Sequence, residues 1–321
     1  MLRISRIIIS ITFFLTISLA NAQQASMLSQ NMFSIPFINP AYAAINESIF
    51  ATAFTRQQWM GLTDSEGNHI APTTYLVAVN VPSSLLKGGL GLSMSEDKLG
   101  FFKDVSVNLQ YAYKIELSQG ILGIGGQLSV INRNINFGKF IAIDGNDPVI
   151  SGMGDNISSL LADVGVGAFY NVTGKYYLGL SVINLLETKG ASFTETGSGQ
   201  PILDRTAYLS GGYEFEIPNK PEYRFIPSIL IKSNFSSTQI SISSLLQYNN
   251  KFWGGVTYNM QTADAIAILI GMQNKNFRIG YAYDLPLSSI NPSGSHEIMV
   301  SYSFDIDFDK SRNSYRNTRF L

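Results

Sequence analysis

The chain has 321 residues, of which 45 % are hydrophobic but only 14 % are charged, and its formal net charge is −1. An ordinary soluble domain carries about 25 % charged residues, so this chain is short of charge rather than rich in apolar side chains. The small net charge gives no electrostatic reason to expect a nucleic-acid partner. The sequence contains no cysteine, which excludes disulfides, thiol catalysis and thiolate metal sites.

Residues 1–22 have the three parts of a secretory signal peptide. Arg3 and Arg6 supply the positive start, residues 7–19 form the apolar stretch, and Ala20-Asn21-Ala22 is a small-residue cleavage site. The apolar stretch is short for a membrane anchor, so we expect cleavage before Gln23. No later segment of the sequence approaches the run of about 18 apolar residues that a membrane helix needs.

Residues 48–306 are dominated by strict alternation of apolar and polar side chains. The clearest case lies between Val105 and Leu117, where the odd-numbered positions are apolar or aromatic and the even-numbered ones are mostly polar. A period of two is typical of a strand with two different faces. About fourteen such segments follow one another, starting near Ser48, Thr73, Gly88, Asp104, Ile121, Leu161, Tyr176, Arg205, Tyr223, Thr238, Phe252, Asp264, Phe277 and His296.

The links between these segments alternate between short and longer ones. Links such as 118–120 and 249–251 are short, whereas 58–72, 132–160 and 186–204 are long. Short periplasmic turns opposite longer outer loops are typical of outer-membrane barrels. We therefore predict an all-β fold, a transmembrane up-and-down antiparallel β-barrel of about 14 strands in contact with outer-membrane lipid. Both termini would then be periplasmic, and residues 307–321 would form a polar tail.

The predicted inner face carries charges of both signs, and several strands contain glycine. Mixed charge favours an internally paired, plugged lumen over a selective pore, which is usually lined by one dominant sign. The inward charges are Lys114, Glu116, Glu214, Glu216, Lys232, Arg278 and Asp284. Gly123, Gly125 and Gly126 are expected on a crowded inner wall.

Three local patterns resemble chemical sites but lack the features that such sites require. The run Gly88 to Gly91 lacks the following helix of a phosphate loop. Ser295 and His296 are adjacent, but no third orienting group or oxyanion site accompanies them. Residues 144–147 (Asp-Gly-Asn-Asp) lack the distant acid of a calcium loop and suit a turn. We therefore expect no catalytic, cofactor or metal site, and no enzyme activity.

The segment 23–47, which precedes the first predicted strand, does not alternate. Pro36 and Pro40 exclude strand ladders and helix interiors there, while Phe33, Phe37 and Tyr42 need burial. We predict a periplasmic-side segment that plugs or seals the barrel mouth and helps to form a partner-binding surface. The alternative is a structural element that only packs against the first strand.

A family resemblance adds to this interpretation. Three stretches carry it in order: Ser-Gln-Asn-Met-Phe at 29–33, Pro-Phe-Ile-Asn-Pro-Ala-Tyr-Ala at 36–43, and Arg-Gln-Gln-Trp-Met-Gly at 56–61. Together with Gly-Ser-His-Glu-Ile-Met-Val-Ser-Tyr-Ser-Phe at 294–304, they resemble the PorP/SprF family of the type IX secretion and gliding machinery of Bacteroidetes. The chain departs from the family pattern at Asn31, where an aromatic residue is common, and at Ala44, where glycine is common. It also differs in the spacing between Phe33 and Pro36.

The resemblance implies an outer-membrane component that supports secretion or surface anchoring of cargo, including a large secreted adhesin. Its partners would be type IX secretion proteins, among them periplasmic lipoproteins or peptidoglycan-binding proteins. Passive transporters of the fatty-acid type, small porins and barrel hydrolases remain as alternatives. The residues that we associate with plugging or partner binding are Phe33, Pro36, Phe37, Asn39, Pro40, Tyr42, Arg56 and Trp59.

Overall fold

The computed structural model describes residues 27–63, 67, 70–136, 156–190, 200–260, 265–287 and 294–304. The expected signal peptide, the polar tail, His69 and residues 144–147 lie outside this part of the chain. In the described part, no helix is long and apolar enough to cross a membrane.

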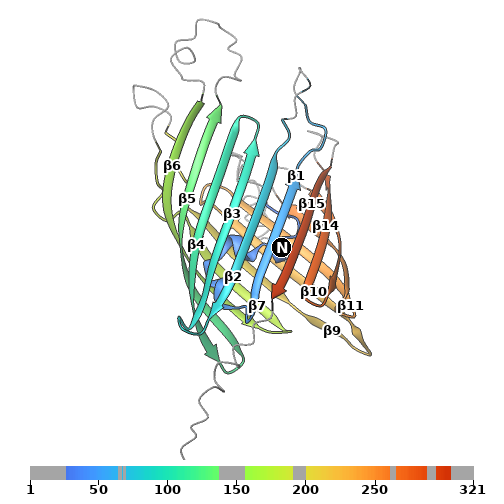
Figure 1. Cartoon of the computed structure of the whole chain (residues 1–321). Coiled ribbons are helices and arrows are strands. Elements are labelled where there is room, and N and C mark those ends of the chain that lie inside the picture. The colour runs from blue at the N-terminus through green and yellow to red at the C-terminus, as the bar shows by residue number, and fades with distance from the viewer. Residues whose placement is uncertain are drawn as a thin grey trace, which may run out of the picture.

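The described strands form one closed antiparallel sheet (Figure 1). Apart from β8 and β9, each strand pairs with its neighbours in sequence, and β1 also pairs with β15, which closes the barrel. The strands are β1 (Ile49–Gln57), β2 (Thr73–Ser83), β3 (Gly88–Leu99), β4 (Phe102–Leu117), β5 (Gly120–Asn136), β6 (Asn156–Val172), β7 (Tyr176–Ile183), β8 (Thr206–Tyr213), β9 (Phe215–Ile217), β10 (Lys220–Ser233), β11 (Thr238–Tyr248), β12 (Phe252–Met260), β13 (Ala265–Asn274), β14 (Phe277–Pro286) and β15 (Ser295–Phe304).

The prediction of an even-stranded barrel is confirmed. β8 and β9 both pair with β10 and are separated only by Glu214, so they occupy one position in a barrel of fourteen. β9 is an extra strand that the alternation did not predict. Closure gives every strand position of the barrel a neighbour on both sides, which is what lipid demands of backbone N–H and C=O groups. Only residues 166–172 of β6 pair with β7, so the outer part of β6 extends beyond that ladder.

The predicted faces of β4 are also confirmed. Val107 and Leu109 on β4 are 37 % and 57 % exposed and face outward, whereas Gln110 and Ala112 are 2 % and 0 % exposed and face inward. The β5–β6 ladder continues to Asn136 and Asn156, well into the predicted link 132–160. The backbone ladder can outlast the apolar alternation, because outward positions beyond the hydrocarbon need not be apolar.

The links at the lower end of the barrel in Figure 1 are all short, whereas those at the upper end range from the two-residue link 100–101 to much longer ones. Gly174, Asn219 and Asn249 in three of the lower links have φ values of 70°, 62° and 51°, a region that glycine and asparagine tolerate. By the rule for outer-membrane barrels this end is periplasmic, and the other is called the outer end below. Outward-facing rings form an aromatic belt at the periplasmic end, with contacts among Tyr170, Tyr176, Tyr213, Phe215 and Phe225, between Tyr223 and Tyr248, and between Tyr302 and Phe304.

Residues 27–47, called the luminal segment below, lie inside the barrel, where Figure 1 shows them as blue coils. They contain η1 (Asn31–Phe33), α2 (Ile35–Ile38) and η2 (Pro40–Ala44). The side chain of Asn39 accepts a hydrogen bond from the backbone N–H of Ala41 at 3.0 Å and so caps η2, which has Pro40 in its first turn. These short turns satisfy part of the backbone locally, and the barrel wall supplies the remaining partners.

Candidate functional site: an occupied barrel lumen

A buried charge cluster of Arg56, Asp284 and Glu297 holds the start of the luminal segment. Arg56 Nη2 lies 2.6 Å from Asp284 Oδ2, and Arg56 Nη1 lies 3.1 Å from Glu297 Oε2. These side chains are 5 %, 4 % and 0 % exposed. They come from the outer halves of β1, β14 and β15, which the register places side by side.

Two carboxylates share one guanidinium in this cluster, and the luminal segment supplies further donors. The backbone N–H of Ser29 donates to Glu297 Oε2 at 2.8 Å, and that of Gln30 donates to Glu297 Oε1 at 2.9 Å. Ser29 Oγ donates to Asp284 Oδ1 at 2.6 Å and accepts from Arg56 Nη1 at 3.0 Å. Buried carboxylates without partners raise the free energy of the folded state. The donors of the luminal segment lower that cost for Asp284 and Glu297.

Polar side chains of the wall bind the backbone of the luminal segment further along. Gln110 Nε2 donates to the Pro36 carbonyl at 3.2 Å, and Ser181 Oγ donates to the Ile38 carbonyl at 2.7 Å. In the opposite direction, Asn39 Nδ2 donates to two wall carbonyls, those of Ala168 and Leu180, at 3.1 and 3.3 Å. The wall thus satisfies the irregular backbone that Pro36 and Pro40 prevent from entering a ladder.

Asn31, at a position where the family commonly has an aromatic residue, makes polar contacts in this structure. Its Nδ2 donates to Ser241 Oγ at 2.6 Å and to Ser243 Oγ at 3.0 Å, both on β11. The side chain is 2 % exposed. The departure from the family pattern is therefore matched by two hydroxyl groups on the facing wall.

Aromatic side chains of the luminal segment pack on apolar patches of the inner wall. Phe33 meets Trp253 with ring centroids 5.2 Å apart, and Phe37 meets Phe54 at 5.8 Å. The patch around Phe54 and Trp253 also includes Leu245, Leu269, Ala282 and Met299. Apolar inward side chains on strands β1 and β11–β15 thus replace the polar lining expected of an open pore.

A second apolar patch covers the end of the luminal segment nearer the periplasm. Tyr42 packs edge-on against Phe169 at 5.4 Å, and Phe169 stacks on Tyr177 at 5.6 Å. Burial raises the pKa of the Tyr42 phenol, partly opposed by the charge of Arg278 and by a hydrogen bond to Asn46. Arg278 itself lies over the Phe33 ring, 4.9 Å from its centroid.

Glycines on the wall make room for η2. A Cβ on Gly125 would lie 2.7 Å from the backbone N of Ala41 and from the carbonyl C of Pro40. A Cβ on Gly126 would meet only the Gly165 carbonyl oxygen, at 3.7 Å. The sequence-based expectation that Gly126 lies on the inner wall is wrong, because the two-residue period turns it toward the lipid beside Tyr111.

The structure brings most of the expected site residues together, but not all. Phe33, Pro36, Phe37, Asn39, Pro40 and Tyr42 lie in the lumen, and Arg56 reaches the same segment from β1. Trp59 lies beyond the outer end of β1 with a φ of 48°, and its backbone N–H donates to Ser295 Oγ at 3.3 Å. The luminal segment extends beyond the expected periplasmic mouth, because Ser29 and Asn31 contact the outer halves of their strands. Phe33 and Tyr42 contact Trp253 and Phe169, which lie near the periplasmic ends of β12 and β6.

Several residues of the site were not singled out from the sequence. Asp284 was predicted only as an inward charge, and Glu297 was included only in the motif 294–304. Phe54, Phe169 and Trp253 were not predicted to belong to a site. The available signal was an apolar residue on a face otherwise polar, as at Phe54 between Thr52 and Arg56. Such a residue needs something apolar to cover it inside the barrel.

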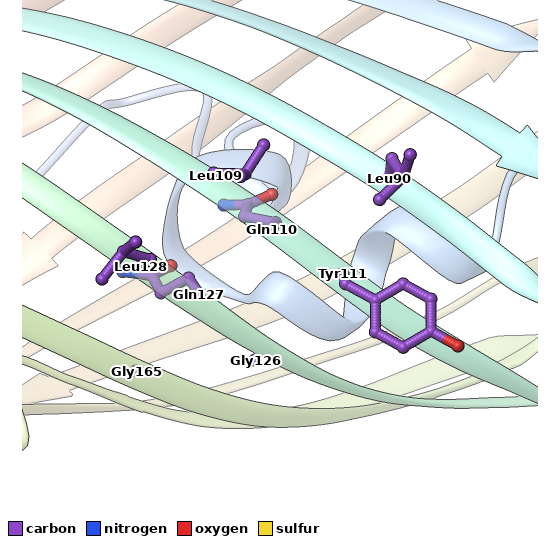
Figure 2. Close-up of a pocket in the computed structure, with 8 residues that line it drawn as sticks. All are labelled: Leu90, Leu109, Gln110, Tyr111, Gly126, Gln127, Leu128 and Gly165. Atoms are coloured by element: carbon purple, nitrogen blue, oxygen red, sulfur yellow. The ribbon is translucent and has the colours of Figure 1, made fainter. Parts of the chain in front are cut away.

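The lipid-facing side of the barrel has a shallow apolar hollow over β3 to β6. Figure 2 shows Leu90, Leu109, Tyr111 and Leu128 around Gly126, with Gln110 and Gln127 on the adjoining wall positions. The hollow has a volume of about 370 Å³ and opens outward. The β4–β5 and β5–β6 ladders continue without a break past it, so it does not lead into the lumen.

The patterns considered for catalysis or metal binding find no support in the described residues. Ser295 faces the lumen and His296 faces outward, because they are consecutive on β15. His296 Nδ1 is 2.7 Å from the Tyr281 hydroxyl and belongs to an outward aromatic group with Tyr283. Within the described ranges no three histidine, aspartate or glutamate side chains are grouped so as to hold a metal ion.

A closed fourteen-position barrel with short turns at one end, a lipid-facing apolar surface and an occupied lumen defines an integral outer-membrane protein. The sequence model of the PorP/SprF family, type IX secretion system membrane proteins, matches residues 20–302. The chain therefore belongs to that family, as its motifs indicated. No curated protein sequence matches the chain significantly.

Solved structures share the fold at low sequence identity. The toluene transporter TbuX of Ralstonia pickettii is 12 % identical, with a TM-score of 0.50 over 85 % of this chain and 94 % of the transporter. The outer-membrane protein Omp33 of Acinetobacter baumannii is 6 % identical, with a TM-score of 0.45 over 80 % of this chain and 99 % of that protein. These likenesses concern the barrel fold.

Proposed function

We propose that this protein is a non-enzymatic component of the type IX secretion machinery whose pore is kept closed by the luminal segment. The observation that carries the proposal is the anchoring of one short segment to the wall by buried charge, backbone and aromatic contacts at several heights. Ser29 is fixed by the charge cluster, Pro36 by Gln110, and Tyr42 by Phe169. An occluded barrel cannot pass cargo itself, so it supports secretion or surface anchoring of cargo through other components.

Periplasmic partners then meet the protein mainly at its periplasmic rim. The rings of Phe33 and Phe37 pack against Trp253 and Phe54 inside the barrel and are not available to a partner in this state. Family membership supports partners within the type IX system, with lipoproteins, peptidoglycan-binding proteins and a large adhesin as the proposed classes. The luminal segment contributes to docking by keeping the wall beneath the rim rigid.

Conductance of the purified protein in planar bilayers tests the closed pore. Phe33, Phe37 and Tyr42 are partly buried. Changing them together to serine therefore removes at most roughly 1.5–3 kcal/mol of burial free energy per side chain. We expect the wild type to stay closed and the triple variant to insert, remain heat-modifiable on gels and conduct ions. Phe235→Ser, at an exposed loop position, is the matched control and should stay closed.

Isolation from membranes tests the partner part of the proposal. The wild type should retain type IX periplasmic proteins, and the triple variant should retain fewer of them. A triple variant that folds, keeps every partner and stays closed would contradict both the plug and its contribution to docking. Failure of the triple variant to assemble would instead indicate that the luminal segment is a purely structural packing element. A urea titration of the single variants would then show whether each substitution destabilises the folded barrel.

A passive channel for apolar solutes is the second candidate. It is favoured by the fold that the barrel shares with a toluene transporter and by the apolar patches on the inner wall. Steady conductance of the wild type, or uptake of toluene by vesicles that contain it, would support the channel and weaken the secretion role.

A further inference from the structure

The described part of the barrel has five exposed lysines at its periplasmic end. Lys220 lies over the Tyr223 ring, and the other four lie in four different turns. Lys87 lies before β3, Lys175 before β7, Lys251 before β12, and Lys275 between β13 and β14. In the described part of the chain, none of the four forms an ion pair, whereas Lys114 on the same side pairs with Glu47 and Glu116. Among the described residues, the ammonium donors of these four lysines are therefore not taken up by an ion pair.

The depth of these lysines is set by the aromatic belt. Tyr176 of the belt directly follows Lys175. Phe252 directly follows Lys251 and is paired with the belt residue Tyr248, and Phe277 follows Lys275 by two residues and is paired with the belt residue Tyr302. Belt rings sit at the boundary between hydrocarbon and lipid headgroups, and one or two extended residues span about 3–7 Å. The lysines therefore extend to the level of the headgroup phosphates.

The turn that contains Lys87 lies at the same level by a different contact. The Tyr111 hydroxyl donates to the Leu86 carbonyl at 2.8 Å, which ties this turn to an outward-facing ring. Leu85 in the same turn is 90 % exposed. An exposed leucine beside an exposed lysine suits the boundary between acyl chains and charged headgroups.

We propose that these four lysines bind the phosphate groups of anionic phospholipids in the periplasmic leaflet, so that the protein selects the lipids around its periplasmic rim. A lipid with net negative charge is favoured over a zwitterionic one, whose own ammonium group repels the lysine. Side chains of this length can also move with the lipid, because their stems lie along the apolar surface.

Native mass spectrometry of the purified full-length protein tests this proposal. Phosphatidylglycerol and phosphatidylethanolamine are added in equal amounts, and the bound lipids are counted. Each lysine near an anionic lipid surface is worth about fivefold in affinity. The wild type should prefer phosphatidylglycerol, and changing Lys87, Lys175, Lys251 and Lys275 to glutamine should abolish the preference.

A matched control uses the two exposed lysines Lys98 and Lys189, away from the short turns. Their replacement by glutamine should leave the preference unchanged, and heat-modifiability on gels confirms that both variants are folded. Equal preference in wild type and quadruple variant would overturn the proposal. So would displacement of the lipid by an equal concentration of inorganic phosphate, or loss of an acidic periplasmic protein by the quadruple variant with its lipid preference intact.

Discussion

Replacing Arg56 with methionine tests whether the charge cluster stabilises the barrel together with its luminal segment. The guanidinium makes ion pairs of 2.6 and 3.1 Å with Asp284 and Glu297, and all three side chains are at most 5 % exposed. The variant leaves two buried carboxylates without their cation, a loss that typically costs about 3–5 kcal/mol. With an m-value of about 3 kcal/mol per M of urea, the unfolding midpoint should fall by roughly 1–2 M.

The assay is a urea titration of the protein refolded into lipid vesicles, followed by the gel shift between folded and unfolded forms. Lys103→Met is the matched control, because the Lys103–Glu96 ion pair has side chains that are 47 % and 39 % exposed. Such a pair contributes about 0–1 kcal/mol, so its midpoint should hardly move. Equal shifts for the two variants would refute the argument from burial.

A second variant separates loss of charge balance from loss of packing. Arg56→Met combined with Glu297→Gln removes one cation and one anion together, so one uncompensated carboxylate remains instead of two. The double variant should be more stable than the sum of the two single effects predicts. Strict additivity would mean that Arg56 and Glu297 do not interact in the folded barrel.

The remaining predictions concern the wall and the start of the chain. Val107→Arg should impair assembly in lipid by about 2–4 kcal/mol, whereas Asn108→Arg, on the inner face, should fold in higher yield; equal yields on gels would contradict the face assignment. Gly125→Ala should make the luminal segment sensitive to added protease, because the new Cβ meets the backbone of η2. In Gly126→Ala the segment should stay as resistant as in the wild type. N-terminal sequencing of the outer-membrane fraction should find Gln23 first, and a retained Met1 would rule out cleavage.

The strand pattern could be predicted closely, because every outward position in the hydrocarbon region of the membrane must be apolar. The predicted starts at Thr73, Gly88, Tyr176, Thr238 and Phe277 coincide with the first residues of strands. β9 escaped prediction because only Glu214 separates it from β8. Its three residues continue the same alternation past the point where β7 has turned away.

The contents of the lumen could be predicted only in part. Proline and unpaired aromatic residues showed that the segment before the first strand needed burial, but alternation alone does not say how far into the barrel it reaches. The two carboxylates that accept from Ser29, those of Asp284 and Glu297, are more than 250 residues away in the sequence. Each inward-facing side chain has to match the part of the luminal segment that it contacts. A single sequence does not reveal which residues are in contact.

The seam between β1 and β15 gives the charge cluster a role in the order of assembly. Arg56 belongs to the first strand, Glu297 pairs with it across the seam, and Ser29 comes from the enclosed segment. The full set of contacts can therefore form only when the first and last strands have met and the segment is already inside. A barrel that closed with its lumen empty would leave Glu297 without the Ser29 and Gln30 donors, so the cluster distinguishes a correctly filled barrel from an empty one at the moment of closure.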